Sequence, residues 1–139
     1  MKPIIKGLLL ALLFSSATLA QESPTVKVEV LSKTSTSWDG SAFEYPKGQP
    51  EITISKITLP PGFKLPMHKH PNPLGGIVLK GEIVVTREDG TTHTVKEGEA
   101  IVELVNTWHY GKNDTDQPTV LLAFYIGEVG VPLSVNKDN

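Results

Sequence analysis

The sequence has 139 residues, of which 39% are hydrophobic and 20% are charged, and it contains no cysteine. This length suits a single domain, and the hydrophobic share is too high for a disordered chain. The absence of cysteine excludes a disulfide scaffold, a thiol nucleophile and a cysteine-ligated zinc site. The 12 Gly and 11 Pro lie between short apolar runs, which argues against a helical bundle.

The first 20 residues have the parts of a secretory signal peptide. Lys2 and Lys6 give a positive start, and an apolar run and then mostly small residues follow. Thr18 and Ala20 fit the small-x-small cleavage pattern, so we expect cleavage after Ala20 and an exported, periplasmic or secreted protein with one domain over 21–139. Because the apolar run is shorter than the roughly 20 residues that span a bilayer, we favour this over an uncleaved anchor and expect no stable membrane insertion after cleavage.

The charge balance argues against a nucleic-acid partner. The chain has 15 acidic and 13 basic residues, and removal of the first 20 residues takes away two lysines and no acid. No basic cluster is present to neutralise phosphates, which supply most of the affinity in such complexes.

The apolar runs after the predicted cleavage site have the period of strands. Thr25–Leu31 alternates valines with Lys27 and Glu29, a pattern typical of a half-buried strand. Glu51–Leu59 does the same, but its spacing slips near Lys56, which indicates either a bulge or a change of face. The other expected strands are 77–79, 83–86, 92–95, 100–105 and 120–126.

The segments between these runs are turns by their chemistry. Asp89-Gly90 is a pair favoured in tight hairpins, and Pro-rich or Asn/Asp-rich segments separate the other runs. No helix of three turns fits without meeting Gly or Pro, and residues 21–24 and 136–139 have the composition of frayed ends. Short strands joined by turns predict an all-β sandwich or barrel. We expect Phe124 and Tyr125 to lie in its core, one of them lining any cavity.

Two histidines have a spacing that suits a metal site. His68 and His70 are two residues apart, so in an extended strand both rings point to one face. Two neutral nitrogens on one element, with a third ligand from elsewhere, suit a divalent metal. Taken alone, the pair fits two half-exposed loop histidines equally well.

Two other residues near these segments are not expected to be ligands. His93, beside the hairpin turn, matches no ligand position and is interpreted as a solvated strand histidine. Trp108 is interpreted as packing outside the site.

The context of these histidines resembles the two motifs of the cupin family, over residues 52–126. The first motif is Gly, five residues, His-x-His, three or four residues, Glu, six residues and Gly; the second is Gly, five residues, Pro-x-Gly, two residues, His, three residues and Asn. The residues in register are Gly62, His68, His70 and Gly81 for the first motif and Gly98, His109 and Asn113 for the second. The resemblance is to small single-domain cupins.

The resemblance implies a jelly-roll β-barrel with one divalent metal held by His68, His70 and His109, usually together with the motif Glu. Two positions depart from the pattern. Leu74 occupies the Glu position, so one family ligand is missing. Asn106 stands in place of the Gly in Pro-x-Gly; asparagine tolerates the left-handed conformation, so we expect the turn to survive.

Glu103 is the candidate to replace the missing carboxylate. It lies in an apolar run six residues before His109, and an unpaired charge there would be costly if buried. Glu103 either faces the cavity, as a metal ligand or a base, or faces outward in a salt bridge or dimer contact. The sequence leaves both alternatives open.

Three functions fit this sequence. The first is a metal-dependent enzyme, dioxygenase-like or isomerase-like, acting on a small organic molecule through open positions on a divalent Fe, Zn, Mn, Ni or Cu ion. The second is a non-catalytic periplasmic module that binds a metal or a small ligand, and the third is a barrel that has lost its metal. We also expect a homodimer in which Thr25–Leu31 covers an exposed sheet edge.

Overall fold

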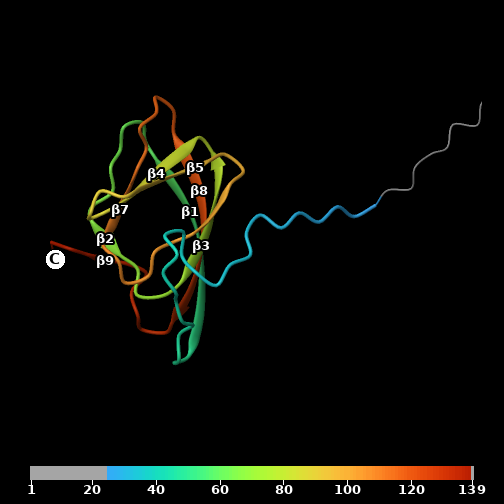
Figure 1. The fold of residues 1–139 in the computed structure, drawn as a ribbon, viewed down its shortest axis with the longest axis vertical. Coiled ribbons are helices and arrows are strands. Elements are labelled where there is room, and N and C mark those ends of the chain that lie inside the picture. Colours follow the sequence, from blue (N-terminus) through green and yellow to red (C-terminus); the bar gives the residue numbers. More distant parts are fainter. Residues whose placement is uncertain (1–24, 139) are drawn as a thin grey trace, which may run out of the picture.

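A computed structural model describes residues 25–138, and all regular structure in this range is β-strand (Figure 1). The predicted signal peptide, residues 1–20, lies outside the described residues. Within the described range no helix could cross a membrane. The strands, in chain order, are β1 (Pro50–Leu59), β2 (His68–Lys69), β3 (Leu74–Lys80), β4 (Glu82–Arg87), β5 (Thr92–Lys96), β6 (Ala100–Val102), β7 (His109–Lys112), β8 (Thr119–Glu128) and β9 (Val135–Asn136).

The strands form two antiparallel sheets. One has four strands in the order β1-β8-β3-β6, and the other has five in the order β5-β4-β7-β2-β9. Neighbours such as β1 and β8, or β4 and β7, are distant in sequence, as expected of a jelly roll and not of a simple meander. The predicted all-β jelly-roll fold is therefore confirmed, although the two sheets do not close into one continuous barrel.

The core lies between the two sheets. Its fully buried cluster contains Leu59 and Val78 from the four-stranded sheet and Ile83 and Val95 from the five-stranded sheet. Burial of each such side chain contributes about 2 kcal/mol relative to exposure. These contacts hold the two sheets face to face, and the candidate site lies in the same interlayer space.

Strand β1 explains the slip in the Glu51–Leu59 pattern. Its pairing with β8 is continuous, without a bulge. Ile52 and Ile54 are 71% and 61% exposed, whereas Ile57 packs against the core. The change of face is therefore the correct alternative, and β1 is apolar on both of its faces.

Two predictions about strand boundaries are corrected, and three short strands gave no periodic signal in the sequence. The predicted strand 100–105 ends at Val102, so Glu103 follows the strand. The short strands β2, β7 and β9 carry too few apolar residues to give a periodic signal. Asn136, expected in a frayed end, pairs with His68.

The predicted strand Thr25–Leu31 is wrong for the isolated chain. No strand forms there, and the segment leads away from the two sheets (Figure 1). Val26, Val28 and Val30 are 91%, 81% and 70% exposed. Alternating valines favour a strand only where a sheet edge is available to pair with them.

The homodimer stays a prediction, and this segment is where it can be tested. If Thr25–Leu31 pairs with a second copy, Val26→Lys combined with Val28→Lys should shift a micromolar dimer to monomer in sedimentation velocity. The physical reason is that two charges would enter an apolar contact. Lys27→Ser, on the other side of the segment, is the matched control and should leave the dimer intact. A wild-type chain that sediments only as monomer at this concentration would contradict the prediction.

Candidate metal centre

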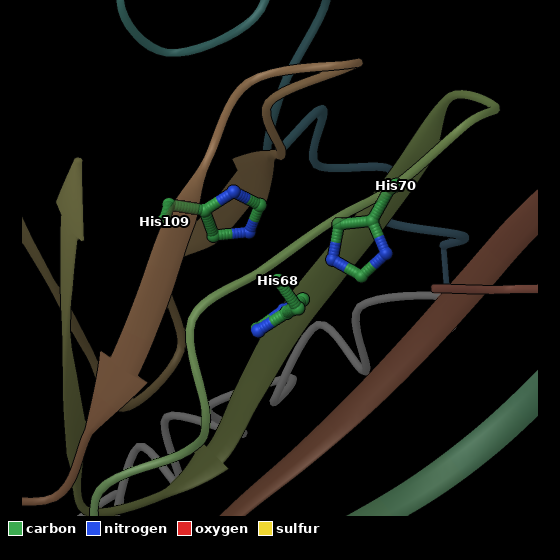
Figure 2. A group of neighbouring side chains, drawn as sticks. All are labelled: His68, His70 and His109. Carbon is green, nitrogen blue, oxygen red and sulfur yellow. The ribbon is translucent and has the colours of Figure 1, made fainter. Parts of the chain in front are cut away.

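Strand pairing brings the three motif histidines together. His68 on β2 lies directly opposite His109 on β7, and His70 follows His68 by two residues and forms a bridge with Val105. The ring centroid of His68 lies 4.9 Å from that of His70 and 4.6 Å from that of His109. The centroids of His70 and His109 are 5.2 Å apart. Figure 2 shows the three rings gathered around one space from two segments of the chain.

Each of the three rings is oriented by a backbone carbonyl. The Nδ1 atom of His68 lies 2.8 Å from the Pro66 oxygen, and that of His70 lies 2.8 Å from the Leu133 oxygen. The Nδ1 of His109 lies 2.7 Å from the oxygen of Thr107. Because a carbonyl can only accept, each Nδ1 carries the proton and each Nε2 keeps a free lone pair. Such outer hydrogen bonds are typical of metal-ligating histidines.

The three rings bring ligand nitrogens close together. One ligand nitrogen from each ring lies within 4.8 Å of the other two. The Nε2 of His109 is buried and has no hydrogen-bond partner among the described residues. Buried polar atoms are rarely left without a partner, so this nitrogen is the one in the cluster that most clearly lacks its ligand. The donor set fits a divalent transition metal.

Burial keeps the three rings neutral at physiological pH. Desolvation lowers the pKa of His68, and it lowers that of His70 from 6.5 to about 4. It also lowers the pKa of His109, against the opposing effect of the Thr107 carbonyl. A neutral imidazole is the form that binds a metal, so the rings need not lose a proton before they coordinate.

Glu103 lies on the wall of the same cavity as the three histidines. Its Oε1 is 3.9 Å from the Nε2 of His109, and it accepts hydrogen bonds from the indole Nε1 of Trp38 at 3.0 Å and the backbone N–H of Leu104 at 2.9 Å. Burial raises the pKa of Glu103. Because burial also lowers the pKa of His109, their contact is not an ion pair at neutral pH in the metal-free protein. Glu103 thus lines the cavity, but the cluster of converging ligand atoms contains only the three histidines and not Glu103.

Trp38 is the residue at this site that the sequence reasoning missed. It stands 65 residues before Glu103 and outside both motifs, so no local pattern could connect the two. Its indole also stacks on His93 at 5.2 Å between ring centroids. The prediction of a solvated His93 is therefore wrong, since this ring is half-buried and packed, although it does not line the cavity.

The two departures from the motif have clear structural outcomes. Leu74 is buried on the cavity wall, where it supplies an apolar side chain in place of a carboxylate. Asn106 has a φ of 51°, and it is the one described residue other than glycine with a positive φ. Its backbone N–H donates to the His70 carbonyl at 2.8 Å. The turn therefore survives without glycine, as expected, and it supports the segment that carries His70.

The closing residue of the second motif has a structural role. Asn113 is fully buried. The two N–H bonds of its side-chain amide are shared among the carbonyls of Leu59, Pro60 and Gln117, at 3.2, 3.1 and 2.7 Å from the nitrogen. These bonds tie the loop after β7 to the end of β1 and place Asn113 outside the metal centre.

The cavity beside the histidines is small and apolar. Its volume is about 100 Å³, and both sheets contribute to its wall. Tyr125 lines it, whereas Phe124 is 40% exposed on the opposite face of β8, so the core prediction is wrong for Phe124. Trp108 lies outside, with the ammonium groups of Lys69 and Lys137 over its ring, as expected. The apolar wall includes Ile57, Leu65, Leu74, Ile77, Val78, Ile83, Val85, Ile101, Leu121, Leu122 and Ala123.

The fold, the histidine cluster and the sequence agree on a class of protein. The cupin domain profile matches residues 55–125, just over half of the chain. This protein belongs to the cupin family. No curated protein gives a significant sequence match.

Solved structures with the same fold include enzymes of different chemistry. An oxalate oxidase in complex with the substrate analogue glycolate has 21% identity and a TM-score of 0.53, over 62% of this chain and 46% of that one. The DMSP lyase DddQ from Ruegeria pomeroyi DSS-3 has 19% identity and a TM-score of 0.53, over 62% and 43%. The polyketide cyclase RemF from Streptomyces resistomycificus has 22% identity and a TM-score of 0.54, over 66% and 63%. This chain thus spans less than half of the first two, and the likeness shows the fold.

The depressed histidine pKa values predict an acid-sensitive metal-free protein. In the unfolded chain His70 takes up a proton near pH 6.5, but in the folded chain it does so only near pH 4. The free energy of unfolding should therefore fall as pH drops through this window, by about 3 kcal/mol for this ring alone, since one pKa unit is worth about 1.4 kcal/mol. Chelator-treated protein unfolded in urea between pH 7 and pH 5 measures the slope.

His70→Gln isolates the contribution of this ring. The variant should reduce the dependence of the free energy of unfolding on pH by up to about 1.4 kcal/mol per pH unit. Glu103 changes the free energy of unfolding in the opposite direction, because its raised pKa favours the folded state at low pH. The test is therefore the difference in slope between wild type and His70→Gln, since Glu103 contributes to the slope of both proteins. Equal slopes would contradict the burial of a neutral His70.

Proposed function

We propose that His68, His70 and His109 bind one divalent transition-metal ion through their Nε2 atoms, with Glu103 as the fourth ligand, and that the protein is a metal-dependent enzyme acting on a small organic molecule. The observation that supports this most strongly is the shared orientation of the three rings. Three backbone carbonyls hold the three Nδ1–H groups, and one ligand nitrogen from each ring lies close to the other two on the wall of an apolar cavity.

The environment of Glu103 supports its place in this centre. A buried carboxylate must be neutralised, paired or bound to a metal. The two N–H groups on its Oε1 stabilise the charged form, but burial still raises its pKa in the metal-free protein. A dication beside it would reverse that balance. Glu103 would thus supply the negative charge that Leu74 does not.

The cavity suits chemistry at an open coordination position. When bound, the metal would supply a Lewis acid with positions left for water, dioxygen or substrate. The chain's own contribution is to limit the access of bulk water with an apolar wall and to place Glu103 and Tyr125 on that wall. Dioxygenase-like or isomerase-like reactions both fit this arrangement, since the fold is used for many chemistries.

The wall also limits the substrate. An apolar cavity of 150 Å³ is large enough for benzene, so a cavity of about 100 Å³ takes about four non-hydrogen atoms beyond the ligands. Among the described residues, no Lys or Arg lines the cavity. A carboxylate of the substrate that does not bind the metal would therefore find no cationic side chain to pair with. We therefore propose a small uncharged molecule with one or two atoms that can reach the metal.

The metal is one of Fe, Zn, Mn, Ni and Cu. Imidazole ligands favour Zn, Cu, Fe and Ni over Mg and Ca, and a carboxylate also suits Mn. Availability in the compartment decides among them. We propose an exported, periplasmic or secreted protein on the basis of residues 1–20.

A non-catalytic binding module is the second candidate. It is favoured by the scarcity of proton-transfer groups, because among residues 25–138 the cavity wall holds only Glu103 and Tyr125 besides the three histidines. Product analysis with Fe- or Mn-loaded protein and a panel of small uncharged substrates separates the candidates. Turnover lost in the histidine variants supports the enzyme, whereas ligand binding without turnover supports the module.

Metal loading tests the site itself. Untagged wild-type protein should hold one equivalent of metal by elemental analysis. The triple variant His68→Ala, His70→Ala and His109→Ala should hold none and should keep its β-rich circular dichroism, because the buried cluster Leu59, Val78, Ile83 and Val95 lies outside the ligand set.

The matched control for this experiment is His93→Ala. It removes the fourth histidine of the chain, which does not line the cavity, and at saturating metal it should still hold one full equivalent, even if its affinity falls. Full loading of the triple variant would show that the metal binds elsewhere.

A further inference from the structure

A short N-terminal loop packs against the end of β6, beside the proposed metal centre. Thr36 and Ala42 form a bridge that closes the loop. The backbone N–H of Trp38 donates to the Val102 carbonyl at 3.0 Å, and the buried Ser37 hydroxyl donates to the Glu103 carbonyl at 2.9 Å. The loop thus adds to the edge of the four-stranded sheet at the point where Glu103 leaves β6. It lies outside the residues that match the cupin profile.

The Trp38 side chain extends from this loop to the carboxylate. Its Nε1–H donates to Glu103 Oε1 at 3.0 Å, and the Leu104 N–H donates to the same oxygen at 2.9 Å. The indole is itself fixed, because its ring stacks on His93 with an interplanar angle of 12° and because Asp39, the next residue, lies 3.6 Å from the Arg87 guanidinium. One carboxylate oxygen is therefore oriented by two donors, one of which comes from the N-terminal loop.

We infer that Trp38 is a positioning residue of the metal centre, which holds the Glu103 carboxylate toward the Nε2 of His109. Partners that orient a ligating carboxylate by hydrogen bonds control the affinity of a site for its metal. In this chain the carboxylate comes from a residue after β6 and not from position 74, so its orientation depends on a loop outside the two motifs. The inference rests on the proposed function, since it assigns Trp38 a role toward that metal.

Zinc affinity in a double-mutant cycle tests this role. Trp38→Phe removes the indole N–H and keeps an aromatic ring against His93, and it should lower the affinity for Zn²⁺ by about tenfold or more. Glu103→Gln removes the carboxylate charge. In that background Trp38→Phe should lower the affinity further by less than about twofold, because the group that it orients no longer binds as a carboxylate. Competition with a chromophoric chelator measures all four affinities.

Two further measurements separate positioning from general damage to the fold. His93→Ala removes the stacking partner but keeps the indole N–H, so its loss of affinity should be smaller than that of Trp38→Phe. The d–d absorption of the Co²⁺ form should differ between wild type and Trp38→Phe but not between Glu103→Gln and the double variant. If Trp38→Phe folds poorly, Trp38→Tyr is the second variant. Its hydroxyl does not occupy the position of the indole N–H, so the same losses of Zn²⁺ affinity are expected.

Equal losses from Trp38→Phe in the wild-type and Glu103→Gln backgrounds would overturn the inference, as would an unchanged affinity in the wild-type background. In both cases a wild-type protein that binds one Zn²⁺ keeps the three-histidine proposal intact. A wild-type protein that binds no Zn²⁺, Co²⁺, Fe²⁺ or Mn²⁺ would overturn the proposed function and this inference with it.

Discussion

The site depends on the three hydrogen bonds that hold the histidine Nδ1 atoms. A free imidazole can present either nitrogen, and it can rotate. Here the carbonyls of Pro66, Leu133 and Thr107 remove both freedoms. Because the carbonyls belong to the backbone, the fold itself sets which nitrogen faces the cavity. The β2–β7 pairing places His68 opposite His109. The Leu133 carbonyl, just before β9, supports His70, and β9 itself pairs with β2. A change in these strands would therefore alter the ligands without any substitution of a histidine.

Charge is the second constraint on the centre. Three neutral histidines carry none, and the cavity wall is apolar. Glu103 is thus the one described carboxylate on that wall, and in the metal-free protein burial opposes its ionisation. The protein offsets part of this cost by two N–H donors, of which one is the Trp38 indole. Leu74, at the position that carries Glu in the cupin motif, is buried against the same space. Metal binding and ionisation of Glu103 would then be coupled, since each favours the other.

Most of the fold and the clustering of three histidines could be predicted from the sequence, for reasons that particular residues make clear. Alternating apolar residues predicted β1, short apolar or β-branched runs and the Asp89-Gly90 turn predicted β4, β5 and β8, and motif spacing pointed to His68, His70 and His109. Asn106 predicted a left-handed turn without glycine because asparagine tolerates that conformation. The contact between Trp38 and Glu103 could not be predicted, since it depends on tertiary packing across 65 residues. The side to which Glu103 points was also open, because it follows the end of β6 and strand alternation no longer applies to it. The predicted strand Thr25–Leu31 was wrong because its alternating valines have no sheet edge to pair with in the isolated chain, and they are exposed.

The most direct test of this account is a crystal structure of the metal-loaded protein, with anomalous diffraction recorded at the absorption edge of the metal. The account predicts one anomalous peak per chain in the space between the three rings, about 2.0–2.1 Å from the Nε2 atoms of His68, His70 and His109, as expected for imidazole ligands. A Glu103 oxygen at a similar distance would complete the set. A peak on Nδ1 atoms, or a peak elsewhere on the chain with this space empty, would contradict the central claim that the backbone carbonyls prepare three Nε2 atoms for one metal.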